Sequence, residues 1–104
     1  MVKTLARTVE NLRSIPGVGP SIALDLVELG YRRVEDLRGE DPEAMYDALS
    51  SRRGVRQDRC LLYVFRCAVY YASQAKHDPL LLKWWNWKDA SLRRGRQARR
   101  GDSR

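Results

Sequence analysis

Helix-breaking residues divide this chain into short segments whose apolar residues recur at helical spacing. A Pro-Gly pair at 16–17 interrupts the first segment, while Asp41-Pro42 and Asp78-Pro79 each place a capping side chain before a proline, the pattern of a helix start. The alternation of apolar and polar residues that marks a half-buried strand is absent along the sequence. The pattern predicts an all-α fold, a small bundle of about five helices.

The expected helices cover residues 2–14, 20–29, 42–53, 58–76 and a last segment through residue 87. A short turn is expected at 34–37. In the third helix, Met45, Ala48 and Leu49 are expected to form the inner stripe. The segment 58–76 is the longest and is apolar nearly all round, which predicts a central, buried helix.

Three tryptophans lie close together in the last expected helix. Trp84 and Trp87 are three residues apart and share one face, so we expect them to close the core. Trp85 then lies toward the other side, where its ring is available to stack on a base or to contact a partner.

Basic residues are concentrated at the C-terminal end of this 104-residue chain, whose net charge is +7. Residues 90–104 contain six arginines and one aspartate, whereas residues 1–89 hold the other fourteen basic side chains against twelve acidic ones. We therefore expect one helical domain at 1–89 and a flexible arginine-rich arm at 90–104. In the arm, Arg93, Arg94 and Arg96 are candidate contacts to DNA phosphates, because a basic segment attracts an anionic partner.

Few residues of this chain are suited to catalysis. One histidine, His77, and two cysteines, Cys60 and Cys67, cannot supply a histidine-based triad or a zinc site with several ligands. We expect a protein that is not an enzyme, with both cysteines reduced and buried. A signal peptide or a membrane-spanning run is not visible, so a cytoplasmic protein without membrane contact is expected.

The segment from Leu12 to Ala23, LRSIPGVGPSIA, carries two glycines just before a proline that opens a helix. Glycines at 17 and 19 permit a tight turn and leave the backbone N–H groups unshielded. Together with the free donors at the start of the following helix, these N–H groups form a concave, partly positive site for a phosphate oxygen. Because the donors belong to the backbone, such a site binds DNA without reading its bases.

This segment resembles the helix-hairpin-helix motif of SAM-like domains. The resemblance implies that a DNA phosphate is held by the N–H groups of Gly17, Gly19 and Ile22, with Val18 and Ser21 in the same phosphate-contacting loop. The alternative is a tight Gly-Pro connector that binds no ligand.

The same resemblance implies further roles for the turn. A monovalent cation such as K⁺ or Na⁺ would be bound by the backbone carbonyls of Arg13, Ile15 and Val18. The packing positions of the motif fall on Leu12, Ile15, Val18, Ala23 and Leu26. This sequence departs from the DNA-binding pattern at Asp25 and Glu28, whose carboxylates would repel a polyanion.

Several short segments follow the turn in a characteristic order. They are Leu29-Gly30, Val34-Glu35-Asp36-Leu37, Asp41-Pro42-Glu43-Ala44-Met45-Tyr46, Asp58-Arg59-Cys60, Tyr63-Val64-Phe65-Arg66 and Trp84-Trp85-Asn86-Trp87-Lys88-Asp89. Over about residues 12–89 the chain resembles the bacterial pathogenicity-locus family, whose members are often labelled mitomycin resistance proteins. The resemblance implies a small, all-α, bacterial and cytoplasmic protein. A role around crosslinked DNA would fit that label.

Basic and aromatic side chains form one stripe on the longest expected helix. Arg59, Tyr63, Arg66 and Tyr70 recur at i, i+4, i+7 and i+11. One interpretation is a nucleic-acid surface, in which arginine contacts phosphate and tyrosine stacks on bases. The favoured alternative is an edge of the core in which an arginine is paired with a carboxylate.

These observations predict a non-enzymatic protein that binds DNA without sequence preference and is linked to DNA repair or stress. The alternative is a protein-interaction adaptor that docks on a repair or regulatory partner through the surface of the turn and Trp85. The sparse catalytic inventory argues against an enzyme.

Overall fold

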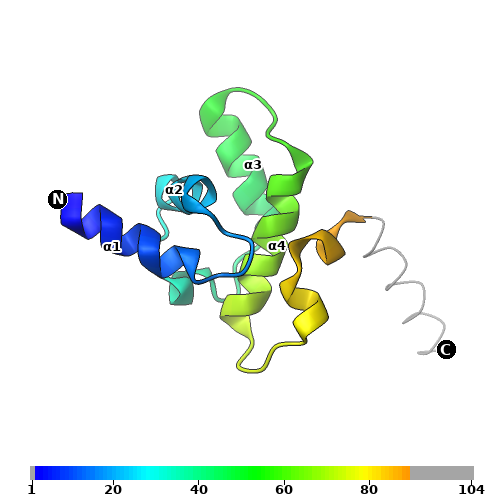
Figure 1. The fold of residues 1–104 in the computed structure, drawn as a ribbon. Coiled ribbons are helices and arrows are strands. Elements are labelled where there is room, and N and C mark those ends of the chain that lie inside the picture. The colour runs from blue at the N-terminus through cyan, green and yellow to red at the C-terminus, as the bar shows by residue number, and fades with distance from the viewer. Residues whose placement is uncertain (1, 90–104) are drawn as a thin grey trace.

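The computed structural model describes residues 2–89 and is all-helical over that range (Figure 1). Within it lie four α-helices, α1 (Val2–Arg13), α2 (Pro20–Glu28), α3 (Pro42–Arg53) and α4 (Arg59–Ser73), and three short 3-10 helices, η1 (Val34–Leu37), η2 (Pro79–Leu82) and η3 (Trp84–Trp87). The all-α prediction is confirmed.

The expected arm at 90–104, with Arg93, Arg94 and Arg96, lies outside the described residues. None of the helices described between residues 2 and 89 is long and apolar enough to cross a membrane.

Aspartate caps form the helix starts that the sequence predicts. The carboxylates of Asp41, Asp58 and Asp78 each accept the backbone amide two residues further on, at 3.0, 3.0 and 2.9 Å. These bonds satisfy N–H groups that the first turn of a helix leaves unpaired. Gly54 ends α3 in the left-handed conformation, with φ +70°.

The central helix is shorter than expected. α4 ends at Ser73, three residues before the predicted end at Lys76, and Gln74 is already extended. The carbonyl of Tyr71 accepts a hydrogen bond from His77 Nε2 at 2.8 Å, and the two rings stack 4.7 Å apart. These contacts hold the chain in a turn after Ser73, so His77 lies beyond the helix.

The single last helix predicted for this chain is wrong. η2 and η3 are separate turns divided at Lys83, whose backbone is extended. Side chains satisfy the carbonyls here: Trp87 Nε1 donates to the Leu81 carbonyl and Asn86 Nδ2 to the Leu80 carbonyl, both at 2.7 Å. These bonds stabilise a folded segment, residues 79–89, that packs along α4.

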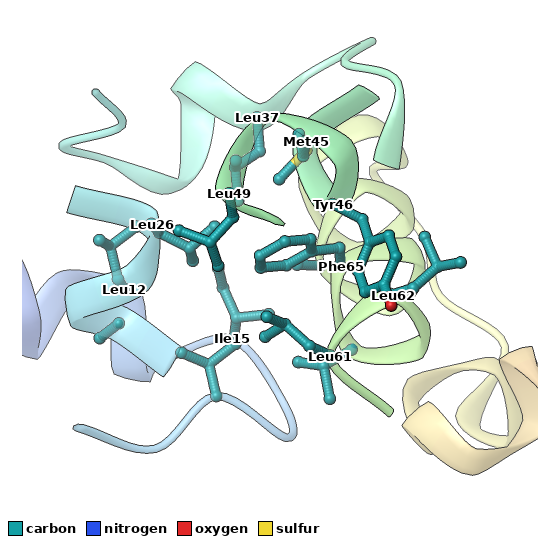
Figure 2. Close-up of a cluster of buried hydrophobic side chains, with 14 of the residues drawn as sticks. Leu12, Ile15, Leu26, Leu37, Met45, Tyr46, Leu49, Leu61, Leu62 and Phe65 are labelled. Atoms are coloured by element: carbon teal, nitrogen blue, oxygen red, sulfur yellow. The ribbon is translucent and has the colours of Figure 1, made fainter. Parts of the chain in front are cut away.

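α4 is the central helix, as predicted, and α3, η1, η2 and η3 pack around it, while α1 packs against α2 (Figure 1). Phe65 of α4 is fully buried in the middle of the core, and Leu49 and Tyr46 of α3 lie on either side of it in the view of Figure 2. The five packing positions implied by the resemblance are all buried: Leu12, Ile15, Val18, Ala23 and Leu26.

Two burial predictions are wrong. On α3 the inner face is formed by Met45, Tyr46 and Leu49, whereas Ala48 is exposed. Tyr46 was missed because it is amphipathic: its ring is buried while its hydroxyl donates to the Gln57 carbonyl. Cys60, in the first turn of α4, is also exposed.

Cys67 is buried as expected and lies where three segments of the chain meet. Its Sγ is 3.5 Å from the Leu82 carbonyl oxygen and 3.9 Å from that of Pro16. Burial raises the pKa of this thiol to about 11. The side chain therefore acts as a small apolar residue that joins α4 to η2 and to the connection between α1 and α2.

Candidate functional site

The connection between α1 and α2 is the α1–α2 turn (residues 14–19). Ile15 and Val18 anchor it in the core, and the Val18 amide closes it by donating to the Ile15 carbonyl at 3.1 Å. Gly17 has φ +87°, a conformation that favours glycine, and it is exposed. The anchors thus fix the turn while part of its backbone faces solvent.

Four backbone N–H groups at this turn have no hydrogen-bond partner among the described residues: those of Gly17, Gly19, Ser21 and Ile22. Ser21 and Ile22 lie in the first turn of α2, where a helix leaves its N–H groups free. Unpaired donors and the positive end of the helix dipole together attract an anion. These residues are four of the five turn positions at which the sequence predicts a phosphate contact.

Val18 is the fifth position, and the structure gives it a different role. Its amide is already paired with the Ile15 carbonyl and the residue is 6% exposed, so Val18 anchors the turn, and its phosphate contact stays a prediction. The carbonyls of Arg13 and Val18 have no partner within residues 2–89, and that of Ile15 accepts one bond. Because a carbonyl oxygen has two lone pairs, the three fit a monovalent cation, which stays a prediction.

Gly19 occupies a conformation that any residue could adopt, with φ −91° and ψ −173°. A Cβ added at this position would meet nothing within 4 Å. The fold therefore does not require glycine here. The missing side chain instead leaves the backbone open to a close approach from outside.

The two carboxylates of α2 that should repel DNA are paired with arginines at the end of α3. Arg53 Nη2 lies 2.6 Å from Asp25 Oδ1 and 3.1 Å from Glu28 Oε1, and Arg52 Nε lies 3.5 Å from Glu28 Oε2. The hydrogen bond from Arg53 holds the pKa of Glu28 below its usual value. Two positive and two negative groups leave this surface without net charge.

Arg59 and Arg66, which were expected as possible DNA phosphate contacts, are engaged by carboxylates instead. Arg66 is 8% exposed and donates to Glu43 Oε1 at 2.7 Å, to Asp89 Oδ1 at 2.9 Å and to the Trp87 carbonyl at 2.8 Å. Arg59 donates to Asp89 Oδ2 at 2.9 Å, and this bond is the main reason why the pKa of Asp89 falls to about 2. The favoured interpretation of this stripe, in which an arginine is paired with a carboxylate at the edge of the core, is therefore confirmed.

The tryptophans connect the C-terminal segment to the α1–α2 turn. Trp84 lies against Gly17, because a Cβ added to that glycine would come within 3.0 Å of Trp84 Cδ1. Trp87 packs on Tyr70 with ring centroids 5.5 Å apart. Trp85 is 47% exposed and contacts Trp84 edge-on at 5.8 Å. The exposed indole of Trp85 therefore contacts Trp84, which in turn lies against Gly17 of the turn.

A cavity of about 340 Å³ opens beside the same turn. Gly17 and Ile22, which contribute two of the unpaired amides, line it together with Trp84 and the Asp25–Arg53 ion pair. The sequence did not predict this cavity, because its walls come from α2, α3, α4 and η3, which lie far apart along the chain.

Comparison with known proteins identifies relatives for most of the chain. The family model described as "Cdd1: Pathogenicity locus" matches residues 6–93. The chain belongs to the pathogenicity-locus family. This member is similar to "Mitomycin resistance protein McrB" from Streptomyces lavendulae, at 31% identity over 77 residues that cover 74% of this chain and 70% of that protein. No solved structure matches this pathogenicity-locus protein. The match with the family spans the α1–α2 turn, both arginine–carboxylate clusters and the tryptophan segment.

Proposed function

We propose that this pathogenicity-locus protein binds DNA without sequence preference and without catalysis, and that the α1–α2 turn holds a backbone phosphate. The observation that carries the proposal is the set of unpaired N–H groups at Gly17, Gly19, Ser21 and Ile22. These donors lie at the start of α2, where the helix dipole adds positive potential. Backbone donors on a phosphate carry no base information, which accounts for the lack of sequence preference.

The surroundings of the turn support an anionic partner. Arg52 and Arg53 offset the charges of Asp25 and Glu28, so α2 offers a phosphate no net repulsion. Gly19 leaves room for a strand to approach the backbone. The six arginines of residues 90–104 would add long-range attraction.

In this proposal α1, the turn and α2 act as a helix-hairpin-helix. A monovalent cation on the carbonyls of Arg13, Ile15 and Val18 would hold the shape of the turn. The name of the relative, a mitomycin resistance protein, extends the proposal to a role in DNA repair or mitomycin resistance in the bacterial cytoplasm.

The test is a titration of a short labelled duplex with the full-length protein at two salt concentrations. Gly19→Glu places a carboxylate where the phosphate should lie, and the backbone and open space at Gly19 accommodate the side chain. We expect affinity to fall at least about tenfold, because a hydrogen bond to a charged group contributes about 1.5–3 kcal/mol. Circular dichroism checks that the helices are retained.

Two controls separate the site from general charge effects. Gly19→Ala should bind almost as tightly as the parent, since the methyl group meets no neighbour. Ala75→Glu adds the same charge at an exposed position after α4 and should have a smaller effect. An equal loss in Gly19→Glu and Ala75→Glu would refute binding at the turn.

A gain of affinity provides a second test. Glu28→Gln removes one carboxylate and releases Arg52, whose side chain is 59% exposed. We expect tighter duplex binding and a salt slope that is steeper by up to about 1, the contribution of one additional phosphate contact. Unchanged binding in this variant would show that DNA does not pass over α2.

A protein-interaction adaptor is the second candidate, favoured by the exposure of Trp85 and of Leu80, which are 47% and 60% exposed. This function would replace DNA binding if Gly19→Glu and Glu28→Gln both leave duplex affinity unchanged. A protein bound by the parent, and released by Gly19→Glu and by Trp85→Ala, would then identify the partner surface.

A further inference from the structure

The cavity beside the α1–α2 turn has one apolar and aromatic side. Ile22 from α2, Leu61 and Val64 from α4, and Trp84 from η3 supply this side. The volume of about 340 Å³ lies at the lower end of the range of roughly 300–1,000 Å³ that is usual for small-ligand sites. A cavity of this size and lining suits one planar ring system.

The polar lining of the cavity contains two carboxylates, those of Asp25 and Asp58, beside Arg53 and Gln57. Asp25 uses Oδ1 to pair with Arg53, and Asp58 uses Oδ1 to cap the Cys60 amide. Asp25 Oδ2 has no hydrogen bond among the described residues, while the carboxylate of Asp58 also interacts with the Cys60 thiol. Two carboxylates at one cavity are matched by a ligand that presents N–H donors.

The cavity reaches two residues that carry unpaired amides of the turn. Gly17 and Ile22 line it and also belong to the set of free N–H donors. A group that is covalently linked to a phosphate on these amides would therefore lie at the mouth of the cavity. Nucleotides in a DNA strand have this connection between a planar ring and a phosphate.

From this arrangement we infer that the cavity takes one unstacked nucleobase with an exocyclic amino group, on a strand whose phosphate is bound at the turn. The inference rests on the proposed DNA binding and adds the class of DNA, namely a duplex that contains an unpaired base. Trp84 offers the stacking surface and Asp25 and Asp58 offer the acceptors. An unpaired base is favoured because a paired one must first be removed from the stack.

The experiment compares duplexes of one sequence in titrations with the full-length protein. One duplex is fully paired, and others carry a single unpaired deoxyguanosine, thymidine or abasic residue at the same position. We expect the deoxyguanosine bulge to bind about tenfold tighter than the paired and abasic duplexes, a typical effect of stacking one base on an aromatic side chain. The thymidine bulge, which lacks an amino group, should bind less tightly than the deoxyguanosine bulge.

Variants of the exposed Cys60 test whether the cavity is responsible. Cys60→Phe adds a ring at the cavity opening and should abolish the preference for the bulge, while Cys60→Ser should keep it. Neither change should alter the affinity for paired duplex. Asp58→Asn retains a side chain that caps α4 but replaces an acceptor with a donor, so it should reduce the preference for deoxyguanosine over thymidine.

Alkylation of the Cys60 thiol gives an independent readout. The deoxyguanosine bulge should slow the reaction of Cys60 with N-ethylmaleimide at least about fivefold more than the paired duplex does, because a base in the cavity covers the thiol. Equal protection by both duplexes would overturn the inference.

The outcomes separate this inference from the function on which it rests. Paired-duplex binding that is lost in Gly19→Glu, without any preference for the bulge, supports DNA binding and overturns the cavity inference alone. Absence of all DNA binding overturns both. Deoxyguanosine monophosphate that binds as tightly as the bulged duplex would show a mononucleotide site and overturn the link to DNA.

Discussion

Replacement of Arg66 tests how the C-terminal segment is held to the central helix. The guanidinium is buried and donates to three groups: the Glu43 carboxylate on α3, and the Trp87 carbonyl and the Asp89 carboxylate in the C-terminal segment. Arg66→Met keeps the apolar stem of the side chain and removes all three hydrogen bonds.

The magnitude follows from the exposure of the partners. Loss of one member of a fully buried ion pair costs about 3–5 kcal/mol, because a charge is left without a partner or water. The side chains of Glu43 and Asp89 are 53% and 35% exposed, so both carboxylates can regain water. We therefore expect Arg66→Met to lower the free energy of unfolding by about 2–3 kcal/mol, out of a total of about 5–15 kcal/mol.

Urea unfolding followed by two signals measures this loss. All three tryptophans lie in η3, so fluorescence reports on residues 84–87, while far-ultraviolet circular dichroism reports mainly on α1 to α4. In Arg66→Met the fluorescence transition should come first. Arg59→Met is the matched control, since Arg59 is 43% exposed and its pair with Asp89 should contribute only about 0–1 kcal/mol. Equal losses in the two variants would refute the reasoning.

Three further predictions concern the core, the arm and pH. Phe65→Ala should lower the free energy of unfolding by about 3–5 kcal/mol, and a melting temperature within a degree or two of the parent would contradict the packing. Deletion of residues 90–104 should leave that free energy unchanged but reduce the slope of log affinity against log salt by up to about 5, as duplex titrations would show. The pKa of Asp89 is depressed from 3.8 to about 2, so its stabilisation is present above about pH 4 and is lost as pH falls toward 2. Asp89→Asn should flatten this part of the stability curve, and an unchanged curve would contradict the ion pair.

Local signals in the sequence predicted most of the helical architecture. Asp41 caps α3 as expected, because a cap depends only on residues next to it in sequence. Asp78 also caps, although the element that it begins is the short η2 and not one long helix. The buried positions of the turn were also predicted, through the resemblance of this segment to the helix-hairpin-helix motif. The prediction of a single last helix failed because side-chain hydrogen bonds, such as that from Trp87 to the Leu81 carbonyl, compete with the backbone hydrogen bonds of a helix.

Local sequence patterns could not predict which charged side chains form ion pairs. Arg53 and Asp25 lie 28 residues apart, and Arg66 lies 23 residues from both Glu43 and Asp89. Such pairs depend on how helices pack, which the spacing of charges along one helix does not specify. The sequence therefore indicated the unpaired N–H groups of the turn but not the neutralisation of the acidic side chains next to them.

The buried position of Cys67 makes the labelling of its thiol a measure of local opening in the protein. The thiol is fully buried between α4, the Leu82 carbonyl and the Pro16 carbonyl, so a labelling reagent can reach it only when one of these neighbours moves away. Cys60, on the same helix, is exposed and reacts without such a step. The ratio of the two labelling rates in the absence of denaturant, corrected for the higher pKa of Cys67, therefore measures the population of the open form. A ligand that tightens the turn would slow the labelling of Cys67 by a factor that rises exponentially with the stabilisation free energy it provides.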